Sequence, residues 1–163
     1  RFVMANRVER ILEIPNAHIF YRNFSGVEKK YNPAGNRNFC VEIPEDAMVD
    51  NTPLYQVLLE EGWNIRLMPP RNEGDAPMHY IQVNVSFKNV PPNIWMIAGR
   101  RKTRLDEGSV DSLDYAEIKT VDLVINPYNW EPGRVKAYLK TMYIEIVQDA
   151  FADKWAALEG PDM

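Results

Sequence analysis

Apolar and polar residues alternate along several short stretches of the chain, with the period of two that marks a β-strand with one buried face. The clearest stretch is 79–88, where Ile81, Val83, Val85 and Phe87 share one side and hydrogen-bonding side chains occupy the other. Further runs predict strands at residues 17–24, 36–43, 63–68, 93–98, 120–127 and 134–147. The pattern therefore predicts a mostly β protein with a few short helices.

The last of these strands changes phase near its middle. Its apolar positions are first Val135, Ala137 and Leu139 and then Met142, Ile144 and Ile146. The alternation thus slips by one residue near Thr141, and a β-bulge there keeps both halves facing the core. Long, bent strands of this kind occur where a sheet curls into a barrel.

Turn residues divide the strands. The segment 31–35 contains proline and ends in Gly35, so it is expected to join the strands at 17–24 and 36–43 into a long-looped hairpin. Pro132-Gly133 is expected to turn the chain into its last strand.

Helix signals are weaker and lie at three places. Thr52 is a candidate cap for a short helix with Pro53 in its first position and Gly62 at its end. Further helices are expected at residues 109–118, with Ser109 as the cap, and at 148–158.

This order of elements favours an OB-like, curled antiparallel β-barrel, in which a helix precedes the last two strands. A β-sandwich is the alternative that the same strands permit. The 163 residues are expected to form one domain. Within it we expect a core barrel at about 17–147, an insertion at about 44–78, and a C-terminal helix or tail at 148–163.

The net charge of −4 conceals alternating blocks of opposite sign. The blocks carry +4 for residues 1–41, −6 for 42–79, +5 for 80–104, −6 for 105–131 and −1 for 132–163. One interpretation is a mixed solvated surface. The other is a basic face built from the first, third and last blocks, which would attract nucleic acid despite the acidic total.

Little in the sequence supports catalysis. His18 and His79 are the only histidines, and Cys40 is the only cysteine, in a strand-like run that favours a buried structural thiol. Phosphate-loop, dinucleotide-binding and HExxH zinc motifs are absent. We therefore predict a protein that is not an enzyme, with no metal or other cofactor, no disulfide and no membrane-spanning helix, in the cytoplasm.

Aromatic residues are interleaved with basic ones, a combination that holds single-stranded nucleic acid by base stacking and phosphate neutralisation. The candidates for binding are Tyr21, Arg22, Phe24, Lys29, Lys30, Tyr31, Arg37, Tyr128, Trp130, Arg134, Lys136, Tyr138 and Lys140. Many of these rings could instead belong to the core. The best stacking candidates are Tyr31, in a turn-rich segment, and Tyr138, on the outer side of the last strand. By contrast, Trp63, Trp95 and Trp155 are assigned to the core or to helix packing.

A second basic group lies at residues 99–104. Arg100, Arg101, Lys102 and Arg104 place four cations within five positions. They are expected either to form a mobile loop that clamps phosphates or to be a solvated hairpin tip.

Several motifs resemble a family of small phage and prophage proteins over residues 17–147. They are Tyr21–Gly26, Tyr31–Val41, Glu61–Asn64, Asp122–Trp130 and Val135–Tyr143. The family looks like phage single-stranded DNA-binding, helix-destabilising proteins with an OB-type barrel. The resemblance implies a protein that coats and protects single-stranded DNA in the host cytoplasm and removes its secondary structure during replication or recombination, with phage replication or recombination proteins as further partners. The alternative is a structural or adaptor protein of the phage particle that does not bind nucleic acid.

Overall fold

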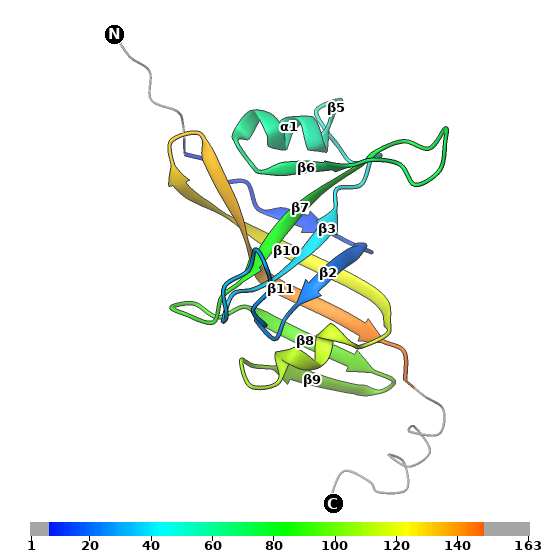
Figure 1. The fold of residues 1–163 in the computed structure, drawn as a ribbon, viewed down its shortest axis with the longest axis vertical. Coiled ribbons are helices and arrows are strands. Elements are labelled where there is room, and N and C mark those ends of the chain that lie inside the picture. Colours follow the sequence, from blue (N-terminus) through cyan, green and yellow to red (C-terminus); the bar gives the residue numbers. More distant parts are fainter. Residues whose placement is uncertain (1–6, 149–163) are drawn as a thin grey trace, which may run out of the picture.

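The computed structural model describes residues 7–148 and is built mainly of β-strands (Figure 1). The strands are β1 (Leu12–Ile14), β2 (Ile19–Asn23), β3 (Arg37–Glu42), β4 (Met48–Val49), β5 (Thr52–Pro53), β6 (Ile65–Met68), β7 (Met78–Val85), β8 (Asn93–Ala98), β9 (Arg101–Leu105), β10 (Ile118–Glu131) and β11 (Arg134–Ile146). One α-helix, α1 (Leu54–Glu61), and one 3-10 helix, η1 (Val110–Asp114), complete the described part. The mostly β prediction is confirmed.

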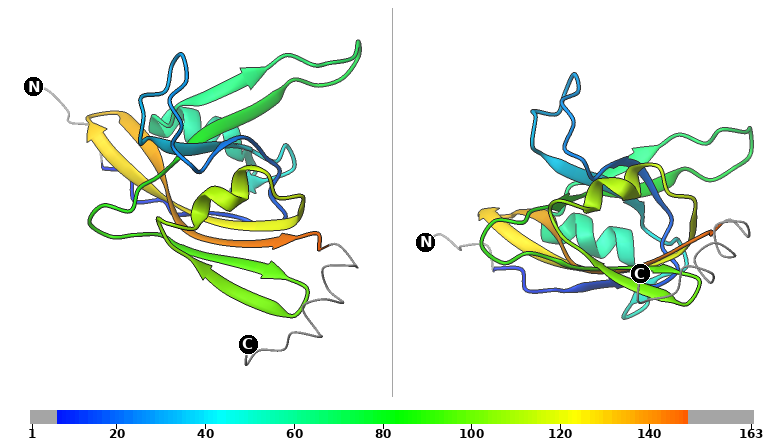
Figure 2. Two further views of the ribbon diagram at one scale, coloured as in Figure 1. Left: turned by 60° about the horizontal axis from the view of Figure 1, so that its bottom comes forward. Right: turned by 90° about the horizontal axis from the view of Figure 1, so that it is seen from below.

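Nine of the strands belong to one sheet, in which β1, β10, β11, β7, β3 and β2 are neighbours in that order. In addition, β6 pairs with β7, and β8 pairs with both β11 and β9. The sheet curls on itself, and η1 precedes the last two strands as the OB-like prediction requires (Figures 1 and 2). A single curled sheet, rather than two packed ones, accounts for the core, so the sandwich alternative is not supported.

Strand β11 is the centre of this sheet because it pairs with three others. It runs antiparallel to β10 along one edge but parallel to β7 and then to β8 along the other, so the sheet is not wholly antiparallel as expected. The predicted bulge is present: Val124 pairs with Thr141 but Ile125 pairs with Leu139, which leaves Lys140 as the extra residue. This residue lies between the segment that pairs with β7 and the segment that pairs with β8. The bulge therefore lets one strand change partner and still keep its apolar side chains inside.

The core is a single cluster formed by the inward sides of these strands. Its largest fully buried members are Phe24, Phe39, Ile14, Ile43, Leu58, Ile81, Ile94, Leu113, Leu123, Ile125, Met142 and Ile144. As predicted, Ile81, Val83 and Val85 of β7 and Trp63 are buried there. The inward positions of β11 follow the predicted phase shift, with Ala137 before the bulge and Met142 after it.

Helix α1 ends where the sequence predicts. Gly62 has a φ of 99°, and its N–H donates to the carbonyls of Leu58 and Leu59. A Cβ at this position would collide with the carbonyl oxygen of Gly133, so glycine is required both for the turn and for the close approach. The expected cap is wrong, because Thr52 lies in β5 and no side chain caps the helix.

Other expectations need correction. Strand β1 was not predicted, because its three residues are too few to show an alternating pattern. The helix expected at 109–118 is only the short η1, and the Ser109 hydroxyl accepts a hydrogen bond from the Asp106 N–H rather than capping it. The helix expected at 148–158 falls almost wholly outside the described residues.

Candidate nucleic-acid interface

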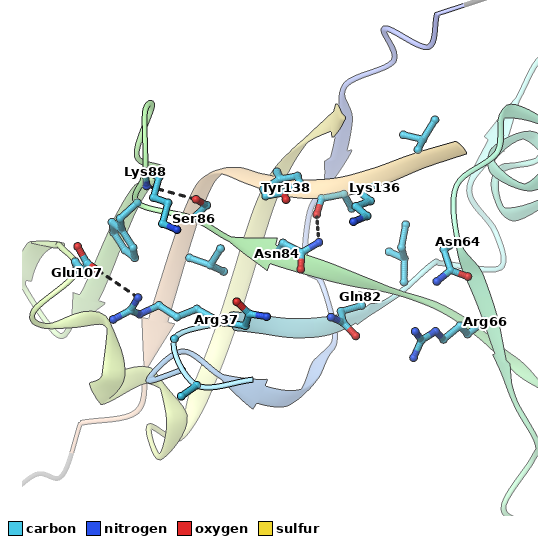
Figure 3. Close-up of a pocket in the computed structure, with 18 residues that line it drawn as sticks. Arg37, Asn64, Arg66, Gln82, Asn84, Ser86, Lys88, Glu107, Lys136 and Tyr138 are labelled. Carbon is cyan, nitrogen blue, oxygen red and sulfur yellow. Dashed lines mark hydrogen bonds and ion pairs between the residues drawn. The ribbon is translucent and has the colours of Figure 1, made fainter. Parts of the chain in front are cut away.

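A groove of about 840 Å³ runs along the polar side of β7 (Figure 3). We call it the β7 groove. Its polar and charged lining comes from β7 and the residues just after it, from the start of β3 and the loop before it, from the region of β6, from the start of β11, and from the segment between β9 and η1. These residues are Asn36, Arg37, Asn64, Arg66, Gln82, Asn84, Ser86, Lys88, Glu107, Lys136 and Tyr138.

The alternation of β7 creates the floor of the groove. Val83 and Val85 point into the core, so Gln82 and Asn84 point to the opposite side. The Asn84 side-chain amide donates to the carbonyl of Ala137 at 3.2 Å, which ties the floor to β11. Because Tyr138 is the register partner of Asn84, its side chain stands beside this floor.

The charges of the lining are mainly positive. Four cations, Arg37, Arg66, Lys88 and Lys136, face one carboxylate, Glu107. That carboxylate lies 3.4 Å from the Arg37 guanidinium, while the other three cations have no ion pair among residues 7–148. The groove can therefore attract a polyanion, and amide and hydroxyl groups along its floor can hydrogen-bond to bases.

Aromatic rings adjoin the groove on the outer side of the β10–β11 hairpin. The rings of Tyr128 and Tyr138 meet edge to face, with centroids 5.6 Å apart. Next to them, the Trp130 ring lies 5.4 Å from the Arg134 guanidinium and 4.8 Å from the Lys136 ammonium group. Tyr128 and Trp130 are both exposed. The hairpin thus extends the groove with rings and cations, the two components of a single-strand interface.

The long loop between β2 and β3 carries three more of the predicted residues. Figure 2 shows this loop (blue) projecting from the sheet. At 88% exposure, Tyr31 is free of the core as expected, and the Lys30 ammonium group lies 5.3 Å from its ring centroid. Lys29 is also exposed. The last residues of the loop, 34–36, line the β7 groove, so the loop rises from its rim.

Two of the predicted binding residues have side chains that serve the fold. Phe24 is fully buried and stacks on Phe39 with ring centroids 5.2 Å apart, so it has no face for a base. The Arg22 guanidinium donates to the carbonyls of Leu113 and Ala116 at 2.8 and 2.7 Å and thereby holds η1 against β2. Alternation is a poor guide here because a register shift interrupts β2.

The basic group at 100–104 is not a mobile loop. Arg101, Lys102 and Arg104 belong to β9, which pairs with β8, and Arg100 lies in the tight turn between them. None of the four lines the β7 groove. The structure therefore separates them from Arg37, Lys136 and Tyr138. Lys140 is likewise exposed at the bulge and outside the lining.

Trp95 also differs from its expected place in the core. It is only half-buried, and its ring lies 4.5 Å from the Lys102 ammonium group and 5.9 Å from the Arg104 guanidinium. Tyr143 joins the same group, with its ring 5.7 Å from Lys102. This cluster on β8, β9 and β11 is a second basic and aromatic surface.

Several groove residues were missed as candidates. The polar side of β7 was visible in the sequence, but Gln82, Asn84 and Ser86 carry no charge and were not singled out. Arg66 lies in an acidic block of the chain, and only the pairing of β6 with β7 brings it to the groove.

The described residues contain no group of three or more histidine, cysteine, aspartate or glutamate side chains that could hold a metal. No helix among them is long and apolar enough to span a membrane. Cys40 is buried as predicted, and burial raises the pKa of its thiol to about 11. A nucleophile needs the thiolate, so this environment suits a structural residue.

A curled β-sheet with a basic, polar groove and exposed aromatic rings is the arrangement of a single-stranded nucleic-acid binding module. A family profile described as "Putative phage ssDNA-binding domain" matches residues 3–162. The chain belongs to this family, and the resemblance of its motifs is thereby confirmed.

Among solved structures, the single-stranded DNA-binding protein from bacteriophage Enc34, in a C-terminally truncated form, is similar over 90% of this chain and 96% of its own. The TM-score is 0.48 and the sequence identity is 14%. No curated protein is significantly similar in sequence to this chain.

Proposed function

We propose that the chain binds single-stranded DNA along the β7 groove and the outer side of the β10–β11 hairpin. The observation that carries the proposal is the lining of the groove, in which four cations face one carboxylate over a floor of amide and hydroxyl groups. Arg66, Lys88 and Lys136 neutralise phosphates, Gln82 and Asn84 contact base edges, and Tyr138 offers a ring for stacking.

Binding at such a site favours the single strand over the duplex. Bases must be unstacked to reach the ring of Tyr138 and the side chains of β7, and a duplex keeps them stacked. Because the protein binds the open form, mass action shifts DNA melting toward it. In this way the protein coats and protects displaced strands and removes their secondary structure during phage replication or recombination. It acts without catalysis and in the host cytoplasm.

The direct test is a mobility shift with labelled oligo-dT, a matched duplex and a matched RNA, each at two salt concentrations. We expect the oligo-dT complex to be the tightest and to weaken as salt rises, because phosphate binding releases counterions. Indifference to all three nucleic acids would contradict the proposal and favour a structural protein of the phage particle. Equal binding of RNA would broaden the ligand to single strands in general.

A further inference from the structure

Tyr21 has a backbone conformation that is unusual for a residue with a large side chain. Its φ is 50°, in the left-handed region that glycine adopts freely. The cause is a bulge in β2: Phe20 pairs with Cys40 and Asn23 pairs with Asn38, so two residues of β2 face one of β3. A left-handed residue is common at one type of bulge, but that position is normally a glycine.

The bulge directs the Tyr21 ring outward, where it is 66% exposed. Its only aromatic contact among the described residues is with Phe20, edge to face at a centroid distance of 4.8 Å. Phe20 in turn contacts Tyr80 edge to face at 5.3 Å. We call Phe20, Tyr21 and Tyr80 the β2 platform.

The β2 platform continues the side of the sheet that carries the β7 groove. Paired residues on neighbouring strands point to the same side. Tyr80 is paired with Arg66, and Phe20 is joined to Gln82 through Cys40, which pairs with both. Arg66 and Gln82 line the groove. A single strand of DNA that leaves the groove past Arg66 therefore meets the β2 platform next.

We propose that Tyr21 is a base-stacking residue and that the β2 platform extends the single-strand site beyond the β7 groove. This inference rests on the proposed function and adds a further stacking point, across β3 and β7 from Tyr138. The exposed ring contributes little to the core, yet its residue occupies a strained conformation. Strain of this kind concentrates at functional sites, where the side chain is needed in that direction.

Two substitutions separate the contribution of the Tyr21 ring to binding from the cost of its strained backbone. Both Tyr21→Gly and Tyr21→Ala remove the ring, but only glycine fits a φ of 50° without penalty. We expect both variants to bind long oligo-dT more weakly by the same factor, roughly 5- to 140-fold for one stacked base. We also expect Tyr21→Gly to melt at a higher temperature than Tyr21→Ala. Tyr21→Phe keeps the ring and should retain the affinity of the unmodified protein.

The matched control is Tyr115→Ala, which removes another exposed tyrosine that does not line the groove. Affinities are measured by fluorescence anisotropy with oligo-dT of about 4 to 16 nucleotides, the range of single OB-fold sites. The loss of affinity in the Tyr21 variants should be small for the shortest oligo-dT, which the groove alone holds, and should reach its full size for the longest. Tyr115→Ala should change neither series.

Unchanged affinity of Tyr21→Gly for every length would overturn the platform while leaving the groove intact, provided that the unmodified protein binds. An equal loss at all lengths would also overturn it, because the ring would then belong to the groove itself. Failure of the unmodified protein to bind oligo-dT would instead refute the proposed function.

Discussion

The ammonium group of Lys136 lies 4.8 Å from the centroid of the Trp130 ring, across the tight turn that joins β10 to β11. The same side chain lines the β7 groove. One lysine thus connects the exposed aromatic hairpin with the polar floor, and its charge is available to a phosphate that crosses between them.

Replacing this lysine should weaken binding through charge. We expect Lys136→Gln to lower the affinity for oligo-dT and to make the slope of log K against log salt shallower by about 0.7, the value for one phosphate contact to a single strand. The measurement is a salt titration of oligo-dT affinity. Lys119→Gln is the control, because it changes the net charge equally but removes a lysine that pairs with Glu145 outside the groove. Equal slopes in the two variants would show that only the overall charge matters.

The two predicted stacking residues should differ in their effect on stability. Tyr31→Ala should cost roughly 1–3 kcal/mol of binding, as for one stacked base, and leave the melting temperature unchanged, because Tyr31 is 88% exposed. Tyr138→Ala should weaken binding to a similar extent and also lower the melting temperature slightly, because its ring packs edge to face on Tyr128. Oligo-dT affinity and thermal unfolding are measured in parallel. Full affinity in both variants would remove these rings from the interface.

Phe24 should behave in the opposite way. Its ring is fully buried against Phe39, so Phe24→Ala should cost roughly 3–5 kcal/mol of folding free energy. The fraction that remains folded should bind oligo-dT with unchanged intrinsic affinity. Urea unfolding measures the loss of folding free energy. Oligo-dT binding at low temperature, where more of the variant is folded, measures the intrinsic affinity. Normal stability with reduced affinity would mean that Phe24 contacts DNA after all.

The four cations of the β8–β9 hairpin form a separate test. Replacing Arg100, Arg101, Lys102 and Arg104 by serine should weaken binding several-fold, because the second basic surface would no longer neutralise phosphates outside the groove. The melting temperature should stay nearly unchanged, because all four residues are exposed. The matched comparison adds Lys136→Gln to this variant. Because the two surfaces share no lining residue, their effects on the binding free energy should add. If the four serines leave the oligo-dT affinity unchanged, the β8–β9 hairpin is a solvated edge of the sheet that does not contact DNA.

Cys40 gives a prediction about pH. Burial raises the pKa of its thiol to about 11, so at pH 8 about one molecule in a thousand carries the reactive thiolate. The folded state favours the neutral thiol, so this contribution to stability is complete below about pH 9 and is lost as the pH rises through 11. Alkylation of the native protein should be slow at pH 8 and fast after unfolding in urea. Rapid labelling of the native protein would contradict the buried position.

The two bulges show what the sequence can and cannot reveal. The slip at Lys140 is visible because β11 has a strict apolar alternation on either side of it, and a change of phase is easy to see. The bulge at Tyr21 is not visible, because β2 has aromatic residues on both sides and either phase is plausible. Sequence reasoning therefore placed Tyr138 correctly but could not tell that Tyr21 is exposed while Phe24 is buried.

Long-range pairing explains the remaining differences. Arg66 reaches the groove only because β6 pairs with β7, and nothing near Arg66 in the sequence encodes this. The β9 segment has a single buried residue, Leu105, and so does not show the pattern of a strand. It becomes one because all five of its residues pair with β8.

The central place of β11 has a consequence for the order in which the protein can fold. During translation the chain leaves the ribosome with its N-terminus first, so β7 and β8 emerge before β11, the strand that pairs with both of them. Until residues 134–146 are available, the parallel pairings of β7 and β8 cannot form, and the groove lacks Lys136 and Tyr138. Of the pairings that β11 makes, only the one with β10 is local in sequence, and such contacts form fastest. The core and the β7 groove are therefore completed together, when β11 pairs with β7 and β8.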